Sequence, residues 1–146
     1  MKVLFVCRSN AERSQIAEAL FRRLSKKNKV ASAGLALTKE EIGWPPGRVV
    51  SELMLGAGYP GIMRQRRKQL TKRMAKGADL IIILLRKRER RKYVVGYLKR
   101  MNVRYWDVGY GPKAIYTSFP PPTYVYHVQW VSEIDSKVRR LVEEIG

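Results

Sequence analysis

The sequence predicts an α/β fold, a parallel sheet flanked by helices, and three observations support this expectation. Short apolar runs lack polar alternation, which is typical of strands buried on both faces of a sheet. Between them lie stretches whose apolar residues recur at helical spacing. The 146 residues suffice for one hydrophobic core but hardly for two, so we expect a single domain over residues 1–146. Strands that alternate with helices along a chain form a parallel sheet with right-handed crossovers.

The expected elements follow one another along the chain. The runs that we expect to be strands are 2–6, 30–33, 78–85 and 103–106. The first expected helix begins at Ser14, and the others cover 49–55, 86–100 and 128–145. The stretch 80–84 is the most hydrophobic and should be a central strand, and Gly77 before it is a helix-stop signal. Because ligands of parallel sheets bind at the carboxyl ends of the strands, Cys7 stands where chemistry is expected.

The net charge of +18 indicates an anionic partner or substrate rather than a particular fold. Basic residues are concentrated between positions 64 and 104, where the only acidic residues are Asp79 and Glu89. The basic 64–104 region is therefore a candidate surface for an acidic protein or a nucleic acid. A solvated helix face is the simplest interpretation of its densest part, residues 86–92.

No stretch of the sequence is long enough to span a membrane. The longest apolar run covers only 80–85, whereas a spanning helix needs roughly 20 residues. The amino terminus has one lysine and a short apolar stretch that runs into Cys7 without a small-residue cleavage site, unlike a signal peptide. We therefore expect a cytoplasmic protein.

The single cysteine and the single histidine limit the chemistry that the chain can perform. Cys7 has no cysteine partner for an internal disulfide or a thiolate zinc cluster, so it is either a small buried hydrophobe or a reactive group. His127 has no cluster of cysteines or carboxylates beside it in the sequence, so we expect it to be structural and expect no metal site. We expect no cofactor.

The most informative motif is the loop that begins at Cys7 and ends at Arg13 and Ser14. The five residues inside it are Arg8, Ser9, Asn10, Ala11 and Glu12. A loop this short that enters a helix can aim successive N–H groups at one tetrahedral anion, and the same positive field favours the thiolate of Cys7. Arg13 can grip two anion oxygens in a bidentate fork, and Ser14 can donate its hydroxyl to the sulfur. Asn10 tolerates positive φ and can hold the loop.

This loop, with residues 15–19 behind it, resembles the phosphate loop of the low-molecular-weight protein tyrosine phosphatase family and its arsenate reductase relatives. Further stretches that resemble the family are 32–34, 69–71, 78–81 and 105–107. The resemblance implies a four-stranded parallel sheet flanked by helices. It also implies that Cys7 is the nucleophile, that residues 8–14 bind phosphate, and that Arg13 is catalytic.

The sequence departs from the family pattern at several positions. Ser9 stands where a glycine is common, and Glu12 brings a negative charge to the anion site, so we expect Glu12 to point outward. The Asp-Pro pair of the family's general acid is missing, and we expect Asp107 to supply the proton, a role worth about 10²–10⁴ in rate. Trp44 and Tyr110 would line opposite walls of the substrate cleft. The competing interpretations are that Asp107 is a turn or cap residue at the end of a strand, and that the two aromatic residues only pack against the protein.

These features favour a protein tyrosine phosphatase that forms a cysteinyl-phosphate on Cys7, with a phosphorylated protein or a small aryl phosphate as substrate. An arsenate reductase is the second interpretation, and with one cysteine it would need an external thiol to regenerate Cys7. The third is a weak or inactive phosphatase that binds phosphate or nucleic acid, which Glu12 and the missing Asp-Pro pair favour.

Overall fold

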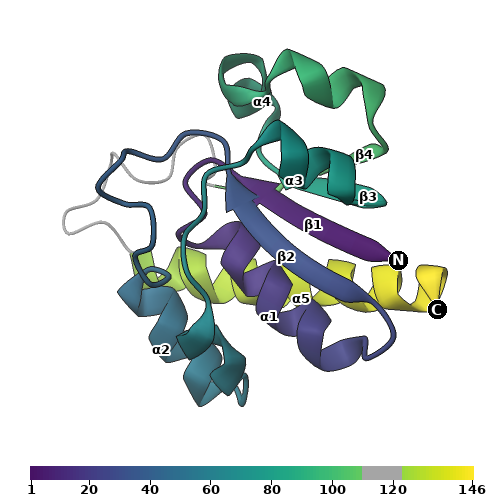
Figure 1. Cartoon of the computed structure of the whole chain (residues 1–146). Coiled ribbons are helices and arrows are strands. Elements are labelled where there is room, and N and C mark those ends of the chain that lie inside the picture. The colour runs from purple at the N-terminus through teal and green to yellow at the C-terminus, as the bar shows by residue number, and fades with distance from the viewer. Residues whose placement is uncertain (110–122) are drawn as a thin grey trace.

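The structure is a computed structural model that describes residues 1–109 and 123–146, with the side chains of residues 123–126 left out of the description. Its sheet has four parallel strands in the spatial order β2-β1-β3-β4 (Figure 1). The strands are β1 (Lys2–Cys7), β2 (Lys29–Gly34), β3 (Leu80–Leu84) and β4 (Val103–Trp106). The α/β fold and the four-stranded parallel sheet expected from the sequence are confirmed.

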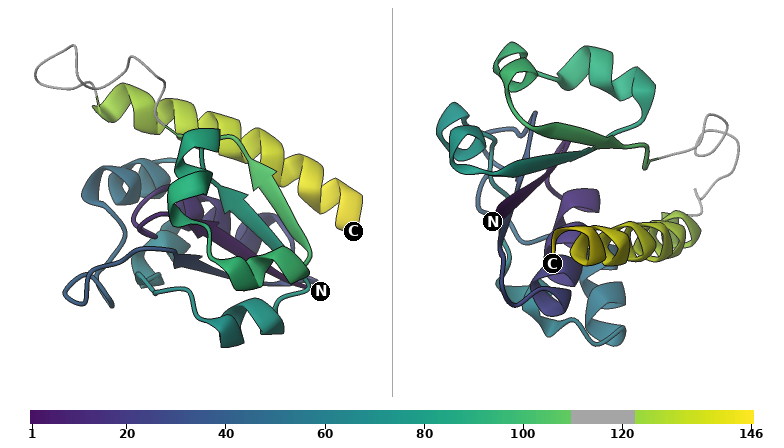
Figure 2. Two further views of the ribbon diagram at one scale, coloured as in Figure 1. Left: turned by 90° about the horizontal axis from the view of Figure 1, so that it is seen from above. Right: turned by 90° about the vertical axis from the view of Figure 1, so that its right-hand side faces the viewer.

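Helices cover both faces of this sheet, as Figures 1 and 2 show. On one face lie α1 (Arg13–Leu24), α2 (Arg48–Gly56) and α5 (Thr123–Ile145). On the other lie α3 (Lys72–Gly77) and α4 (Lys87–Tyr93). Two 3₁₀ helices, η1 (Pro60–Arg64) and η2 (Gly96–Arg100), complete the described elements. No described helix has the length and apolar character needed to cross a membrane.

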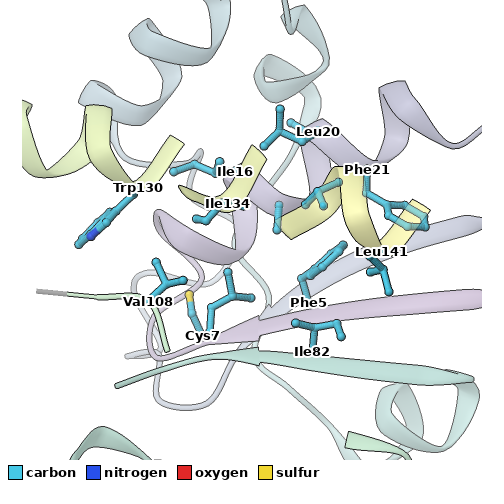
Figure 3. Close-up of a cluster of buried hydrophobic side chains, with 14 of the residues drawn as sticks. Phe5, Cys7, Ile16, Leu20, Phe21, Ile82, Val108, Trp130, Ile134 and Leu141 are labelled. Atoms are coloured by element: carbon cyan, nitrogen blue, oxygen red, sulfur yellow. The ribbon is translucent and has the colours of Figure 1, made fainter. Parts of the chain in front are cut away.

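The alternation of side chains along β1 decides which face each residue occupies. Val3, Phe5 and Cys7 belong to the core beneath α1 and α5, whereas Leu4 and Val6 belong to the core on the opposite face. This follows from the two-residue period of a strand. The Cys7 side chain is thereby directed into the layer that contains α1 (Figure 3). Every residue of β1 after Lys2 is buried, as expected of a central strand.

The expected helix over 86–100 is wrong as a single element. The helix α4 ends at Tyr93, the backbone at Val94 is extended, and η2 begins at Gly96. Two consecutive β-branched valines have low helix propensity, and a break there lets Val94, Val95 and Leu98 turn onto the apolar face of the sheet. Tertiary packing therefore overrides the helical spacing read from the sequence.

Other boundaries also differ from the expectations. The last helix begins at Thr123 rather than at 128, and the third strand is shorter than the expected 78–85. The helix α3 was not expected, although Gly77 was expected to stop a helix and is its last residue. Thr71 caps α3, since its side chain accepts a hydrogen bond from the N–H of Met74.

Phe5 is the aromatic centre of the core beneath α1, so its truncation tests the packing described above. It is fully buried and its ring meets Phe21 edge-on, with centroids 5.7 Å apart. We expect Phe5→Ala to lower the free energy of unfolding by about 3–5 kcal/mol in urea titrations. The control Ile42→Ala, at a half-exposed position, should change it by less than about 0.5 kcal/mol. Equal losses in the two variants would contradict this packing.

Candidate active site

The loop that follows β1 is anchored to the rest of the protein through its carbonyl groups. The carbonyl of Cys7 accepts from the N–H of Leu35 at 2.9 Å, and that of Arg8 accepts from Ala36 at 2.8 Å. The carbonyl of Ala11 accepts from Gly47 at 2.8 Å. These bonds turn the oxygen side of the loop toward the protein.

The N–H side of the same loop is left open. Among the described residues, no hydrogen bond is donated by the backbone N–H groups of residues 8–12. Unpaired buried amides are costly, and successive N–H groups in a tight loop form an anion-binding nest. Asn10 adopts φ 52°, the only described non-glycine residue with positive φ, which bends the chain into this nest. The arrangement fits a tetrahedral oxyanion.

The buried side chain of Asn10 links the loop to the sulfur. Its amide nitrogen donates to the hydroxyl of Ser14 at 2.8 Å and to that of Ser32 at 2.9 Å. The Ser14 oxygen lies 2.9 Å from the Cys7 sulfur. Because Asn10 donates to the Ser14 oxygen, the Ser14 hydroxyl proton is free to point at the sulfur. Ser14 is therefore oriented to stabilise a thiolate.

A second set of hydrogen bonds fixes Asn10 itself. Its side-chain oxygen accepts from the N–H of Lys68 at 2.8 Å and from the amide of Gln15 at 3.2 Å. Gln65 in turn donates to Gln15 at 2.7 Å. On the other side, Ser32 donates to the carboxylate of Glu18 at 2.7 Å. Sequence reasoning did not assign roles to these supporting residues, because their contacts join segments distant in the sequence.

Arg13 occupies the first turn of α1 and is held by two different partners. Its two terminal nitrogens donate to the two carboxylate oxygens of Glu89, at 2.8 and 3.1 Å. One of them also donates to the carbonyl of Val108 at 2.9 Å. Glu89 comes from α4 and Val108 from the segment after β4, so three parts of the chain meet at this guanidinium. No sequence pattern indicated the pairing with Glu89, which lies 76 positions away.

The partners of Arg13 leave one edge of its guanidinium available. Within the described part of the chain, no hydrogen bond is donated by its Nε. Nε and the second hydrogen of Nη2 point in parallel and form a fork that matches two oxygens of an anion. Burial disfavours the charge of Arg13, but the Glu89 hydrogen bond and the nearby Cys7 outweigh it and raise its pKa. Arg13 therefore stays cationic.

Around these groups lies a hollow of about 420 Å³. Cys7, although only 2 % exposed, contributes to its lining. The other lining residues are Arg8, Ser9, Glu12, Arg13, Ala36, Thr38, Glu41, Glu89 and Trp130. Arg8 projects along this rim and stacks on Tyr93 of α4, with its guanidinium carbon 4.8 Å from the ring centroid. The hollow thus joins the sulfur, the open amides and Arg13.

The expectation that Glu12 points outward is wrong. Glu12 is among the residues that line the hollow, and its carboxylate contacts Nε2 of the buried His127 on α5. Because His127 is 115 positions away in the sequence, no local pattern could have revealed this pair. It also gives His127 one carboxylate partner, whereas the sequence shows no cluster of cysteines or carboxylates beside this residue.

The remaining sequence-based candidates lie apart from the hollow or outside the description. Asp107 is half exposed, and its carboxylate lies 3.5 Å from Arg86 rather than in the lining around Cys7. Trp44 is 50 % exposed and lines a separate apolar hollow with residues of α2. Tyr110 lies outside the described residues. The structure therefore gathers the loop residues around the hollow but not Asp107 or Trp44. The described residues contain no group of metal-binding side chains.

Gly34 allows the loop after β1 to approach β2, and this close contact can be tested. An added Cβ would lie 2.8 Å from the amide nitrogen of Asn10 and 2.9 Å from the carbonyl carbon of Ser9. We expect Gly34→Ala to weaken the affinity for inorganic phosphate on the order of 10–100-fold in calorimetry, since small misplacements of a site are costly. Gly77→Ala, where a Cβ meets nothing, is the matched control. Unchanged affinity in Gly34→Ala would contradict the loop geometry.

The ion pair between Glu89 and Arg13 predicts a pH dependence of stability. Burial opposes the charge of Glu89, but the hydrogen bonds from Arg13 outweigh it and lower the Glu89 pKa. A lowered carboxyl pKa stabilises the fold above the unfolded-state value and loses this effect as the pH falls through the folded-state value. We expect Glu89→Gln to lower the free energy of unfolding by about 1–3 kcal/mol at neutral pH. The difference from wild type should shrink below about pH 4.3.

Urea titrations from pH 7 to pH 3 measure this difference directly. Glu144→Gln is the matched control, because Glu144 also pairs with an arginine, Arg104, but at an exposed position where such pairs contribute little. If the difference in unfolding free energy between wild type and Glu89→Gln stayed constant over this pH range, the charge of Glu89 would not be its cause.

Comparison with known proteins agrees with this fold and loop. Residues 2–145 match the family described as low molecular weight phosphotyrosine protein phosphatase. The low molecular weight protein tyrosine phosphatase from T. tengcongensis is 26 % identical, with a TM-score of 0.75 and 99 % of both chains covered. YfkJ from Bacillus subtilis is also 26 % identical, with a TM-score of 0.73 and 99 % and 94 % of the two chains covered.

An arsenate reductase from Archaeoglobus fulgidus shares the fold at 24 % identity, with a TM-score of 0.69 and 97 % and 98 % of the two chains covered. No protein with a curated description matches the sequence. The family match spans nearly the whole chain and includes the loop described above. The chain therefore belongs to the low molecular weight phosphotyrosine protein phosphatase family.

Proposed function

We propose that the protein hydrolyses phosphate monoesters through a cysteinyl-phosphate intermediate on Cys7, with phosphotyrosine in proteins or a small aryl phosphate as substrate. The observation that carries this proposal is the loop after β1, in which unpaired N–H groups, the Arg13 fork and the sulfur share one hollow. Membership of the phosphatase family supports the reaction class.

In this mechanism the phosphoryl group lies in the nest of amides with the sulfur beneath it. The Cys7 sulfur forms a bond to phosphorus while the bond to the leaving oxygen breaks, and the loop amides and Arg13 hold the three remaining oxygens. Water then attacks phosphorus and displaces the sulfur. The hydroxyl of Ser14, 2.9 Å from that sulfur, stabilises it as leaving group. The reaction needs no cofactor.

The roles expected for Asp107, Trp44 and Tyr110 stay predictions within this proposal. To protonate the leaving oxygen, Asp107 would have to leave its contact with Arg86 and reach the hollow. Trp44 would have to extend the substrate site beyond that hollow to the neighbouring apolar surface.

Arsenate reduction is the second candidate, and the shared fold of the Archaeoglobus fulgidus enzyme favours it. The same nest would hold arsenate, another tetrahedral oxyanion. With Cys7 as the only cysteine, an external thiol would have to attack the arsenate adduct on Cys7. Reduction of arsenate in the presence of such a thiol, with no hydrolysis of aryl phosphates, would favour this candidate.

The basic 64–104 region remains a candidate site for an acidic protein or a nucleic acid, and we propose a cytoplasmic location. The exposed surface of α4 supports a polyanion partner, because Glu89, its one acidic residue, is paired with Arg13. Affinity for such a partner should fall steeply with salt, as expected when counterions are released.

Replacement of the nucleophile tests the phosphatase proposal. We expect Cys7→Ser to lower the rate of aryl phosphate hydrolysis by on the order of 10³ or more. It should keep its affinity for inorganic phosphate, because the amides and Arg13 remain. Rapid acid quench followed by mass spectrometry should detect a phosphoryl adduct on Cys7 in the wild-type protein. Equal hydrolysis by the two proteins, or an adduct on another residue, would refute the proposal.

A further inference from the structure

The hollow around Cys7 contains a carboxylate inside the phosphate loop itself. Glu12 stands between Ala11 and Arg13, and its side chain is 30 % exposed. Its carboxylate contacts Nε2 of His127, whose side chain is 6 % exposed. Glu12 therefore lies between the hollow around Cys7 and a buried imidazole.

The contact between Glu12 and His127 requires a proton. A carboxylate oxygen and an unprotonated ring nitrogen are both acceptors and repel each other, so a hydrogen bond between them needs one shared proton. Whichever atom carries it, the pair as a unit contains a transferable proton next to the site of phosphate binding.

The position of His127 is fixed by its neighbours on α5. Its ring meets Trp130 edge-on, with centroids 5.0 Å apart. Trp130 lines the hollow and donates from its indole nitrogen to the carbonyl of Gly109 at 3.2 Å. The C-terminal helix therefore holds the imidazole against the phosphate loop.

The other carboxylates that line the hollow are engaged with cations. Glu89 is bound by both terminal nitrogens of Arg13, whose hydrogen bonds lower the Glu89 pKa despite its burial. Glu41 accepts hydrogen bonds from Thr38, which lower its pKa, and it also pairs with Arg67. Both are thereby held as carboxylates and are poorly suited to give up a proton. Among the described carboxylates that line the hollow, only Glu12 contacts an imidazole, that of His127.

We propose that Glu12 is the general acid of the reaction and that His127 positions it and shares its proton. The inference rests on the phosphatase function proposed above and assigns the proton donor left open by the missing Asp-Pro pair. Its acid is Glu12 rather than Asp107, which lies outside the lining of the hollow.

The proton balance of both chemical steps follows from this assignment. In the first step the Cys7 sulfur bonds to phosphorus, the leaving oxygen departs with the bonding electrons, and Glu12 gives that oxygen the shared proton. The pair is then one proton short. In the second step water attacks phosphorus, the sulfur leaves as thiolate, and Glu12 takes the water proton. The pair and Cys7 return to their initial states.

The charges around the pair make its proton state sensitive to substrate. The charged or titratable groups that line the same hollow are Cys7, Arg8, Arg13, Glu41 and Glu89. A bound phosphate dianion adds negative charge beside Glu12 and favours retention of the proton until the leaving oxygen develops charge. Because the reaction with phosphotyrosine consumes this proton, its rate should fall at high pH.

Glu12→Gln tests the inference, because glutamine keeps the shape and can still accept a hydrogen bond from His127. The readout is the rate with two leaving groups, phosphotyrosine and 2,4-dinitrophenyl phosphate. Tyrosine leaves poorly and needs a proton, whereas dinitrophenolate leaves without one. We expect a fall of about 10²–10⁴ in kcat with phosphotyrosine and little change with the activated ester. The high-pH limb of the phosphotyrosine profile should disappear.

Three further variants complete the experiment. In His127→Gln, kcat should also fall with phosphotyrosine but not with the activated ester. This variant serves as a second test if Glu12→Gln does not fold. Glu40→Gln, at an exposed position outside the hollow, is the matched control. Asp107→Asn represents the competing acid. Circular dichroism checks that each variant is folded, and the affinity for inorganic phosphate checks that its loop is intact.

The possible outcomes separate this inference from the proposed function. Equal losses with the two substrates in Glu12→Gln, no loss at all, or a selective loss in Asp107→Asn instead would overturn the role of Glu12 and leave the phosphatase function standing. Absence of Cys7-dependent hydrolysis of the dinitrophenyl ester by the wild-type protein would overturn both. A selective loss in Glu12→Gln together with retained phosphate affinity supports the inference.

Discussion

The buried amide of Asn10 is the interaction on which the candidate site depends. It joins Ser14 of α1 and Ser32 of β2, while its oxygen accepts from the backbone at Lys68. A residue at φ 52° is unfavourable unless its surroundings hold it there, and these hydrogen bonds supply that constraint. The turn at Asn10 leaves the amides of residues 8–12 without hydrogen-bond partners among the described residues. The same side chain sets the direction of the Ser14 hydroxyl toward Cys7.

The sheet order brings the charged groups to this loop. β1 lies between β2 and β3, so the segments that follow these strands converge on its carboxyl end. The segment after β3 leads into α4 and supplies Glu89, while the segment after β4 supplies the carbonyl of Val108. The helix α5 returns across α1 and brings His127 to Glu12 (Figure 1). A strongly basic chain thus places several carboxylates around the hollow at Cys7, each with its own partner.

Much of this arrangement was predictable because it depends on local patterns. The strands follow from uninterrupted apolar runs such as 80–84, and the loop after β1 follows from the spacing between Cys7 and Arg13. The direction of Glu12 was not predictable, since it depends on a histidine on the last helix. The pair of Arg13 and Glu89 likewise joins residues 76 positions apart. The break at Val94 depends on packing against the sheet, which competes with helical spacing.

These observations connect one local turn to the chemistry proposed for the protein. The fold supplies the position of Cys7 through the alternation of β1, and the hydrogen bonds of the loop backbone supply the direction of its amides. The pair of Arg13 and Glu89 then holds both of these groups in their charged forms. The candidate site therefore combines residues from the sheet and from the helices on both of its faces.

A crystal structure with bound orthovanadate would test the central claim most directly, because vanadate resembles the phosphoryl group in transfer. The account predicts vanadium bonded to the Cys7 sulfur, oxygens that accept from the amides of residues 8–12, and a two-point contact with the free edge of Arg13. Vanadate bound elsewhere, or a loop whose amides face away from it, would contradict the account.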